Sequence, residues 1–515
     1  MSAQHVGLDG PGAPGTLAQA FESCWSRPRL RGLPALGDGE LELDYAQLDA
    51  RTAGLGARLR ALAPSPGQVV AIAMERSLRA ALLLLGALRA GLCPCVMEPG
   101  LAAAEVSRRL RLIGAVAIVH DRAHGDLVAA LEPSPARVVD FGDLECLRPV
   151  ARSVDGLLGS TPALLLFTSG STGQPKAVQL SQGALLNNAV GVAGHCGLDE
   201  RDRLLHVMPL YHTNGLNNQL FAPLLAGSSV VLAPRFRAEH MPALLERHRP
   251  SILTGVPTMF SRMQGQTFSA TALAGLRFAR CGSAPITEAL HRAVEDQLGC
   301  PLLISYGLSE ATCTSTMNPP RGRRIGSVGT VLAGQQVRLR LSDASLSDDP
   351  GVEGEICIAG ANLMSGYVGA ADETSRSVVD GWLRTGDLGR FDADGYLYVT
   401  GRIKDVIIRG GENLSPLLIE GVIMERIAAQ ACCVVARADQ DLGEVPVAVI
   451  VPRPGARFGA EQVMEAVREG LSRIYVPREV ILADSLPENS VGKVDRKELT
   501  RRVRDGTAGR AASAA

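Results

Sequence analysis

The sequence predicts an α/β fold with a large N-terminal domain of mostly parallel sheets, a small β-rich portion and a small α+β C-terminal domain. Segments of helical periodicity, such as residues 45–62, alternate with short apolar runs, which is typical of βαβ units. After Leu332 the pattern changes to short strands separated by turns. A chain of 515 residues is also too long for one ordinary core, so more than one domain is expected.

Short apolar runs bounded by turn residues mark the expected strands. In the α/β part they are residues 69–73, 115–119, 163–167, 229–232, 252–253 and 302–305. In the β-rich part, residues 336–341 and 354–359 are expected to form antiparallel strands. Residues 396–400 form the last expected strand before a charged segment at 401–405.

That charged segment marks the expected boundary between the two domains. Both ends of the chain have low sequence complexity and are expected to be disordered. The expected organisation is a disordered N-terminus at 1–14, an N-terminal domain at 15–401, a hinge at 402–405, a C-terminal domain at 406–504 and a disordered tail at 505–515.

Composition excludes several classes of function. The chain has 52 Lys and Arg against 53 Asp and Glu, so no overall field favours nucleic acid or an anionic membrane. The apolar run at residues 80–88 is too short to span a bilayer, and the N-terminus lacks a signal pattern. Eleven scattered cysteines without zinc-site spacing favour reduced, buried thiols. We therefore expect a cytoplasmic protein without a membrane span.

A loop rich in Gly, Ser and Thr at residues 168–176 follows the expected strand 163–167. Such a loop offers backbone N–H groups, hydroxyls and a lysine to phosphate oxygens. It is not a Walker A loop, because Gln174 follows Gly173, and the only Gly-Lys pair of the chain, at 492–493, is followed by Val494. Taken alone, the loop is equally an ordinary surface turn.

Seven separated segments resemble the motifs of the adenylate-forming, or AMP-binding, enzyme superfamily. This superfamily includes acyl- and aryl-CoA ligases, nonribosomal peptide synthetase adenylation domains and firefly luciferase, and the chain is most similar to the fatty-acid, oxalyl and 4-coumarate CoA ligases. The segments are FTSGSTGQPK at 167–176, PLYHTNG at 209–215, YGLSEAT at 306–312, GWLRTGD at 381–387, GRIKD at 401–405, GGEN at 410–413 and LPENSVGK at 486–493.

The resemblance implies a two-step reaction with ATP, Mg²⁺ and CoA. A carboxylic acid is activated as acyl-AMP with release of pyrophosphate, and the acyl group then passes to a thiol. Because anions meet in the first step, cations and fixed dipoles are required. The resemblance assigns three catalytic residues: Lys493 bridges the attacking carboxylate and the α-phosphate, Glu310 binds Mg²⁺, and His212 borders the carboxylate site. His212 could otherwise be a core histidine.

The resemblance also implies a nucleotide site. Asp387 would accept both ribose hydroxyls, with Arg402 as a second donor on the sugar, and Tyr306 would stack on adenine. Asp387 and Arg402 could each be a turn or ion-pair residue instead. The implied ATP- and AMP-binding residues are Thr168, Ser169, Gly170, Ser171, Thr172, Gly173, Lys176, Gly282, Ser283, Ala284, Tyr306, Gly307, Ser309, Asp387 and Arg402.

In the family, the small domain is mobile and swings between the two half-reactions. Lys404 resembles the family's hinge residue. Gly410 and Gly411 resemble the segment that lines the pantetheine tunnel, although a simple turn explains them equally well.

Two features of the sequence indicate which kind of acid is the substrate. Members that activate amino acids carry an aspartate where this chain has residues 211–214, which argues against an α-amino acid. Asn214 and Asn218 belong to an amide cluster, with Asn217 and Gln219, on one expected helix, which favours a small, partly polar acid unless the cluster faces solvent. Arg280 could pair a second carboxylate or face solvent at a strand end.

The acid could thus be short and polar, a diacid, aryl or fatty. The leading hypothesis is an acid–CoA ligase, active as a monomer or homodimer. One alternative is an enzyme that loads the phosphopantetheine of a carrier protein. A third, a silent nucleotide-binding scaffold, is disfavoured because Lys493, Glu310 and Asp387 are intact.

Overall fold

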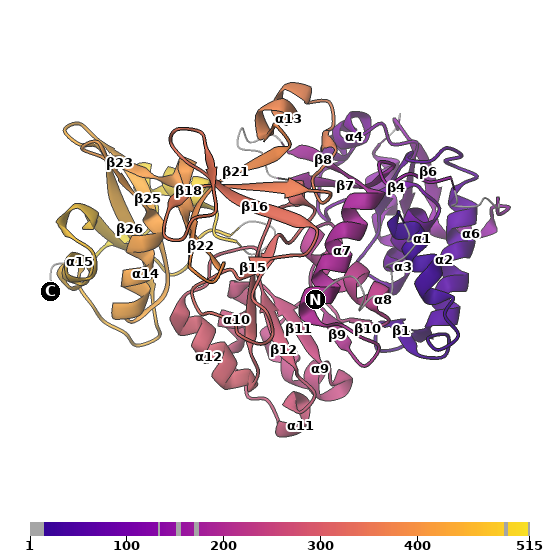
Figure 1. The fold of residues 1–515 in the computed structure, drawn as a ribbon, viewed down its shortest axis with the longest axis horizontal. Helices are drawn as coiled ribbons and strands as arrows, with labels where there is room; N and C mark the ends of the chain where they lie inside the picture. The colour runs from indigo at the N-terminus through magenta and orange to yellow at the C-terminus, as the bar shows by residue number, and fades with distance from the viewer. Residues whose placement is uncertain (1–14, 132–133, 151–155, 169–174, 489–492, 513–515) are drawn as a thin grey trace.

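The computed structural model describes residues 15–131, 134–150, 156–168, 175–488 and 493–512 (Figure 1). The predicted disordered N-terminus, at 1–14, lies outside these residues, as do Ser169, Gly170, Ser171, Thr172 and Gly173 of the predicted phosphate loop. Among the described residues, no helix is long and apolar enough to cross a membrane.

A nine-stranded sheet forms the centre of the larger part, in the order β15-β14-β13-β12-β11-β9-β10-β1-β2. Its middle strands run parallel from β1 to β13, and the short strands at both edges are antiparallel. The strands are β1 (Pro34–Gly37), β2 (Glu42–Asp44), β9 (Arg203–His206), β10 (Ser229–Leu232), β11 (Ile252–Gly255), β12 (Phe278–Cys281), β13 (Leu302–Tyr306), β14 (Thr316–Met317) and β15 (Thr330–Val331).

Both faces of this sheet are buried, which explains why its strands are continuous apolar runs in the sequence. Successive residues face opposite cores: Leu204 and Phe278 belong to one, and Leu205 and Ala279 to the other. Helices α9 (Met241–His248), α10 (Pro257–Met263) and α12 (Glu288–Leu298) cover the second face. Helices α1 (Leu17–Trp25), α3 (Leu78–Arg89), α7 (Gln182–Cys196) and α8 (Ala222–Ala226) pack in the first core.

The remaining α-helices include α2 and α11, which also pack in the first and second cores, α4, which packs in a third core, and the helices of the C-terminal part. The predicted helix at 45–62 ends earlier, at Leu59, and begins with a capping box in which Asp44 and Gln47 bond each other's backbone N–H. These helices are α2 (Tyr45–Leu59), α4 (Ala103–Leu112), α5 (Gly125–Ala129), α6 (Phe141–Cys146), α11 (Ala270–Leu273), α13 (Ala371–Ser377), α14 (Pro416–Arg426), α15 (Ala460–Gly470) and α16 (Arg496–Arg504).

Two smaller sheets flank the central one. A parallel sheet has the order β4-β3-β5-β6, and a second sheet has the order β19-β8-β7, in which β7 and β8 form a hairpin. Their strands are β3 (Val69–Ala73), β4 (Cys93–Val96), β5 (Ala117–His120), β6 (Arg137–Asp140), β7 (Pro162–Thr168), β8 (Lys176–Ser181) and β19 (Gly366–Tyr367).

The predicted β-rich portion is a separate antiparallel sheet in the order β17-β16-β18-β21-β20, with β22 paired to β21. The two predicted antiparallel strands pair directly, as β16 and β18. The strands are β16 (Gln335–Arg340), β17 (Leu346–Ser347), β18 (Glu353–Gly360), β20 (Val378–Val379), β21 (Trp382–Phe391) and β22 (Leu397–Arg402).

The C-terminal sheet has the order β24-β23-β26-β27-β28, with β25 paired to β26, and lies at one end of the molecule with α14 and α15 (Figure 1). The chain changes sheets between Arg402 and Ile407, within or next to the predicted hinge, although the domain limits themselves remain predictions. The strands are β23 (Ile407–Arg409), β24 (Glu412–Leu414), β25 (Ala429–Asp439), β26 (Gly443–Pro452), β27 (Glu479–Leu482) and β28 (Arg510–Ala511).

The end of the described chain differs from the expected disordered tail. Ile481 and Leu482 of β27 pair with β28, and Ala508 is buried in a core cluster with Leu499 and Val503 of α16. Residues 510–512 therefore close the edge of the C-terminal sheet. The fold class is confirmed: a large α/β part, a β-rich sheet and a small α+β part.

Candidate active site

The predicted site gathers where the parallel strands of the central sheet end. The motif at 209–215 follows β9, Gly282–Ala284 follow β12, and Tyr306 ends β13. Parallel strands bring their carboxyl ends to the same edge, which is where open α/β sheets bind ligands. Segments that are up to a hundred residues apart in the sequence therefore meet at this edge.

Asp387 is the centre of the nucleotide side. It lies on β21 and is 4% exposed. The phenol of Tyr306 donates to its Oδ2 at 2.8 Å, and Nε of Arg402 donates to its Oδ1 at 2.6 Å. Burial, together with the Asp387 carboxylate, raises the pKa of Tyr306, so the phenol remains a donor. Each oxygen of Asp387 keeps a lone pair that a hydroxyl could use.

Lys493 joins this cluster from the C-terminal part of the chain. Burial and the nearby Arg402 cation lower the pKa of Lys493, and Asp387 opposes them. Burial, followed by the charge of Lys493, lowers the pKa of His212 to about 4. Lys493 thus interacts electrostatically with Arg402, Asp387 and His212, and the lowered pKa keeps His212 neutral near pH 7.

Lys176 and Glu310 are connected through Tyr367. Lys176 forms an ion pair with Glu373, and its Nζ lies 4.9 Å from the centre of the Tyr367 ring. The phenol of Tyr367 donates to Oε1 of Glu310 at 2.8 Å. Tyr367 and Glu373 could not be identified from the sequence, because both lie outside the recognised motifs. Tyr367 lies on β19, which pairs with β8, and Glu373 follows on α13.

The structure describes only the two ends of the predicted phosphate loop. Thr168 and Lys176 face each other as a register pair where β7 and β8 meet, so the loop between them connects two antiparallel strands. Its five predicted residues in between lie outside the described part of the chain.

The predicted adenine segments lie against other parts of the backbone. A Cβ on Gly307 would lie 2.0 Å from the carbonyl oxygen of Cys313, and one on Gly282 would lie 2.6 Å from Oγ of Ser305. Ser283 has a positive φ of 72°, and Ala284 follows it in the same loop. Ser309 begins a short 3-10 turn that contains Glu310. Substituting Gly307 would therefore displace the chain that carries Tyr306 and Glu310.

The amide cluster on the acyl side lies on a π-helix, η3 (Asn214–Phe221), and is buried, so the solvent-facing alternative is wrong. Nδ2 of Asn218 donates to Oδ1 of Asn214 at 3.1 Å and to Oγ1 of Thr314 at 3.0 Å. Nδ2 of Asn214 lies 3.5 Å from Oγ of Ser283. These bonds connect the predicted acyl pocket with the chain around the adenine segments.

Arg280 is 1% exposed, so the alternative of a solvent-facing arginine is also wrong. Its Nη2 donates to the carbonyl oxygen of Asn218 at 2.7 Å and its Nε to Oγ1 of Thr254 at 3.1 Å, and both partners are neutral. Nη1 is buried and has no hydrogen-bond partner among the described residues. The Cys196 thiol also lies within hydrogen-bond reach of the guanidinium, so this buried cation is left without a charged partner among the described residues.

Further buried polar atoms on the acyl side lack a partner in the described part of the chain. They are Nε2 of His212, Oδ1 of Asn217, and both amide atoms of Gln219. An unsatisfied buried donor or acceptor costs about 1–3 kcal/mol, and such atoms are rare in folded proteins unless a ligand or water uses them. Their concentration on and beside η3 indicates a polar binding pocket.

Arg76 and His206, which the sequence did not single out, hold the segment at 209–215 in place. Arg76, which follows β3, donates to the carbonyl oxygen of Met208 at 3.0 Å and lies 2.7 Å from Nδ1 of His206. Nε2 of His206 lies 2.8 Å from the carbonyl oxygen of Gly215. With Arg76 donating to Nδ1, Nε2 carries the proton and donates to Gly215. Arg76 and His206 thus hold both ends of the segment that carries His212.

The predicted hinge and tunnel residues are exposed. Lys404 lies in the 3-10 turn Ile403–Asp405, between the two sheets. Gly410 and Gly411 have φ values of 58° and 87° and connect β23 to β24, which is the geometry of a tight hairpin turn that favours glycine. The turn alone explains both glycines, and their contact with a thiol substrate remains a prediction.

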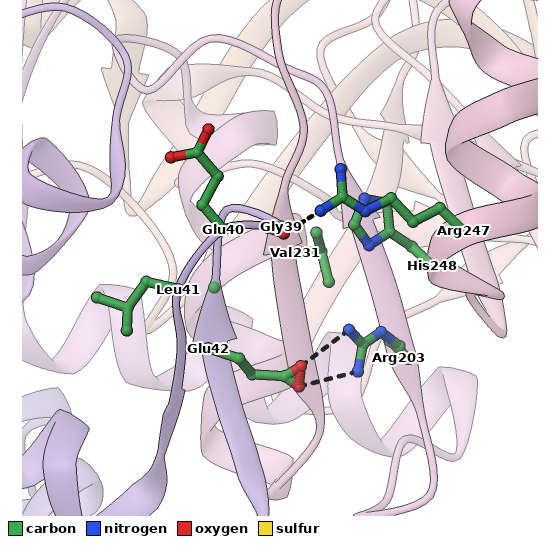
Figure 2. Close-up of a pocket in the computed structure, with 9 residues that line it drawn as sticks. Gly39, Glu40, Leu41, Glu42, Arg203, Val231, Arg247 and His248 are labelled. Carbon is green, nitrogen blue, oxygen red and sulfur yellow. Dashed lines mark hydrogen bonds and ion pairs between the residues drawn. The ribbon is translucent and has the colours of Figure 1, made fainter.

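A surface hollow of about 140 Å³ lies at the edge of the central sheet that β1 and β2 form, beside α9 (Figure 2). Arg203 pairs with Glu42 at 3.0 Å, and Arg247 donates to the carbonyl oxygen of Gly39. None of the predicted site residues lines this hollow.

Comparison with known proteins gives the same result for both parts of the chain. Residues 25–368 match the family described as AMP-binding enzyme, and residues 418–493 match the AMP-binding enzyme C-terminal domain. The chain is 37% identical to the indoleacetate–CoA ligase of Aromatoleum aromaticum over 67% of this chain and 68% of that protein. It is 38% identical to the sulfoacetate–CoA ligase of Cupriavidus necator over 66% of each.

Among solved structures, ATP-bound MatB from Rhodopseudomonas palustris superimposes with a TM-score of 0.89 at 28% identity. The match covers 95% of this chain and 99% of that one. The similarity therefore extends over both the large α/β part and the C-terminal part.

Proposed function

Because the chain belongs to the AMP-binding enzyme family, it is an ATP-dependent acid–thiol ligase, and we propose that its acid carries a second polar or anionic group. The protein activates a carboxylic acid as acyl-AMP, with release of pyrophosphate, and transfers the acyl group to CoA. It uses ATP, Mg²⁺ and CoA.

One observation carries the proposal about the acid: Nη1 of Arg280 is buried and has no hydrogen-bond partner within the described part of the chain, beside the polar helix η3. A guanidinium binds carboxylate or sulfonate oxygens with charge-assisted hydrogen bonds, which would satisfy this group. Gln219, whose two amide atoms have no partner among the residues that the structure describes, adds a donor and an acceptor. A long fatty acid would leave all of these atoms unsatisfied, at a cost of several kcal/mol.

The relatives support this choice in part. Sulfoacetate carries a sulfonate at the end opposite its carboxylate, whereas indoleacetate carries an aromatic ring. The neutral partners and buried position of Arg280 favour the first chemistry. A diacid or sulfonated acid is therefore our leading substrate class, and a short polar acid is the second.

We assign roles to the clustered residues as follows. Lys493 places its ammonium between the attacking carboxylate and the α-phosphate, where negative charge is greatest. Neutral His212 borders the acyl carboxylate, and Lys176 lies at the end of the loop that would hold the β- and γ-phosphates. Asp387 and Arg402 hold the ribose, and Tyr306 offers its ring to adenine.

Glu310 fits the role of a Mg²⁺ ligand. Its Oε1 accepts from Tyr367, which leaves the other oxygen of the carboxylate for an ion. No group of three or more His, Cys, Asp or Glu side chains suited to a metal is found in the described residues. Mg²⁺ commonly binds one or two carboxylates together with substrate phosphates, so a single carboxylate is sufficient. When bound, the ion would neutralise phosphate charge.

Other parts of the proposal concern the second half-reaction and the cell. Lys404 acts as the hinge of a mobile C-terminal domain, and Gly410 and Gly411 border the path of the thiol. A carrier-protein phosphopantetheine is the alternative acceptor, and the enzyme acts as a monomer or homodimer. The eleven free cysteines support a cytoplasmic location, where thiols stay reduced.

The proposal is tested by measuring exchange of labelled pyrophosphate into ATP with matched acids, such as butyrate, succinate and 3-sulfopropionate. We expect the dianionic acids to be preferred. Arg280→Met should lower kcat/KM for them by at least about 30-fold, about 2 kcal/mol, because a buried charge pair is broken. Activity on butyrate serves as the folding control.

Equal losses on all three acids would contradict the role of Arg280. If no acid of a wider panel supports pyrophosphate exchange, the result would instead support the silent scaffold. Product analysis with free CoA and with carrier protein distinguishes the two acceptors.

A further inference from the structure

We propose that Arg262, on the large α/β part, positions the catalytic Lys493 by holding Glu488, whose backbone pairs with Val494 next to this lysine. The inference rests on the proposed role of Lys493. Nη2 of Arg262 donates to both carboxylate oxygens of Glu488, at 2.8 and 3.0 Å. This ion pair connects α10, which follows β11, with the C-terminal part of the chain.

Glu488 is fixed relative to Lys493 by backbone contacts. Glu488 forms an antiparallel bridge with Val494, the residue after the lysine. The N–H of Asp495 donates to the carbonyl oxygen of Pro487 at 2.7 Å, and the Asp495 side chain caps α16. Glu488 is thus paired directly with the residue next to Lys493, so the contact made by Glu488 acts on the backbone that carries this lysine.

The strength of the pair suits a reversible contact. The Arg262 side chain is 56% exposed and that of Glu488 is 32% exposed. Exposed ion pairs change an equilibrium by only a few-fold, and salt screens them. Such a pair can bias the C-terminal part toward the orientation in which Lys493 acts on His212 and the Asp387 cluster, without locking it there.

The alternative is a surface ion pair that has no effect on catalysis, as many are. The two interpretations predict different results when the charges of Arg262 and Glu488 are exchanged. If the pair positions Lys493, then Arg262→Glu and Glu488→Arg each replace an attraction with a repulsion, and the double variant restores the attraction in the opposite sense. If the pair is inert, all three variants behave as wild type.

The experiment measures two half-reactions in each variant. Pyrophosphate exchange reports acyl-AMP formation, and supplied acyl-AMP with CoA reports thioester formation. We expect each single reversal to slow acyl-AMP formation roughly three- to tenfold and to leave thioester formation unchanged or faster. The double variant should return to within about twofold of wild type. Arg292→Glu, in the exposed Arg292–Glu288 pair of α12, is the matched control and should change neither rate.

Equal slowing of both half-reactions, no slowing, or a double variant no better than the single ones would overturn the proposal. A measurement that does not depend on activity separates it from the proposed function. In Arg262→Lys, a carbodiimide should couple the introduced amine to Glu488, and mass spectrometry of the peptides detects the link. A link without exchange on any acid would contradict the proposed function alone, whereas absence of the link would contradict the contact itself.

Discussion

Tyr306 donates its phenol hydrogen to Asp387, with 2.8 Å between Oη and Oδ2. The residue proposed to stack on adenine is thus bonded directly to the residue proposed to bind the ribose. A displacement of either one changes the position of the other. The proposed adenine and ribose sites are therefore joined by one hydrogen bond between β13 and β21.

Tyr306→Phe tests this connection because it keeps the ring and removes the hydroxyl. Loss of a hydrogen bond to a charged group costs about 1.5–3 kcal/mol, so we expect KM for ATP to rise roughly tenfold or more, with a smaller change in kcat. Steady-state kinetics at saturating acid give both constants. Tyr398→Phe is the control, because its hydroxyl bonds Asp392 outside the site, at 3.1 Å. Similar effects in both variants would argue against a specific role for Tyr306.

Lys493→Ala should suppress acyl-AMP formation by two or more orders of magnitude and leave thioester formation from supplied acyl-AMP largely intact. The reason is that the lysine acts on charges that meet in the first half-reaction alone. Pyrophosphate exchange and thioester formation measure the two steps separately. Lys497→Ala, one turn later on the exposed side of α16, serves as the control. Equal loss in both steps would contradict the assigned role.

Lys404→Pro should have the opposite effect. Proline fixes φ near −65° and removes a backbone donor, which would restrict rotation in the exposed turn between the two sheets. We expect acyl-AMP formation to stay within about threefold of wild type, while thioester formation falls at least tenfold. Lys404→Ala separates loss of the side chain from loss of backbone freedom. Normal thioester formation in the proline variant would remove the hinge proposal.

His206→Gln should make stability less sensitive to acid. Burial, followed by the Arg76 cation, lowers the pKa of His206 to about 3, whereas an unfolded histidine titrates near 6.5. The unfolded state therefore binds the proton first, and the free energy of unfolding falls as the pH drops from about 6.5 toward 3. Between pH 6.5 and 4.5 this costs roughly 2–3 kcal/mol.

Glutamine offers one acceptor and one donor in place of Nδ1 and Nε2 but does not titrate. Urea unfolding at pH 6.5 and 4.5 should show a smaller loss of stability in His206→Gln than in wild type. His240→Gln, at an exposed histidine, should match wild type. An unchanged acid dependence in His206→Gln would show that this imidazole is not the group responsible.

Much of the central sheet and of the parallel sheet β4-β3-β5-β6 could be predicted, because parallel strands buried on both faces are continuous apolar runs. The runs at 69–73 and 229–232 coincide with β3 and β10. The predicted run at 115–119 is shifted, because β5 is Ala117–His120 and its start is set by pairing with β3. Local pattern locates a buried strand well and its ends less well.

The residues of the candidate site likewise divide into those that the sequence could predict and those that it could not. Motif residues such as Tyr306, Asp387 and Arg402 are brought together as expected, since each lies in a recognisable segment. Tyr367 and Arg262 could not be found in this way, because their partners are distant in sequence and neither lies in a motif. The burial of Arg280 was equally hidden, since a strand arginine more often faces water.

The buried amide cluster on η3 affects how the acid substrate of this enzyme could change during evolution. Asn218 is bonded at once to Asn214 and Thr314, so replacing any one of them leaves the others with unmet donors or acceptors. Substitutions among such neighbours are not additive. In the proposed acyl pocket, a new acid preference would therefore require paired changes, and a scan of single substitutions would underestimate how far the pocket can be redesigned.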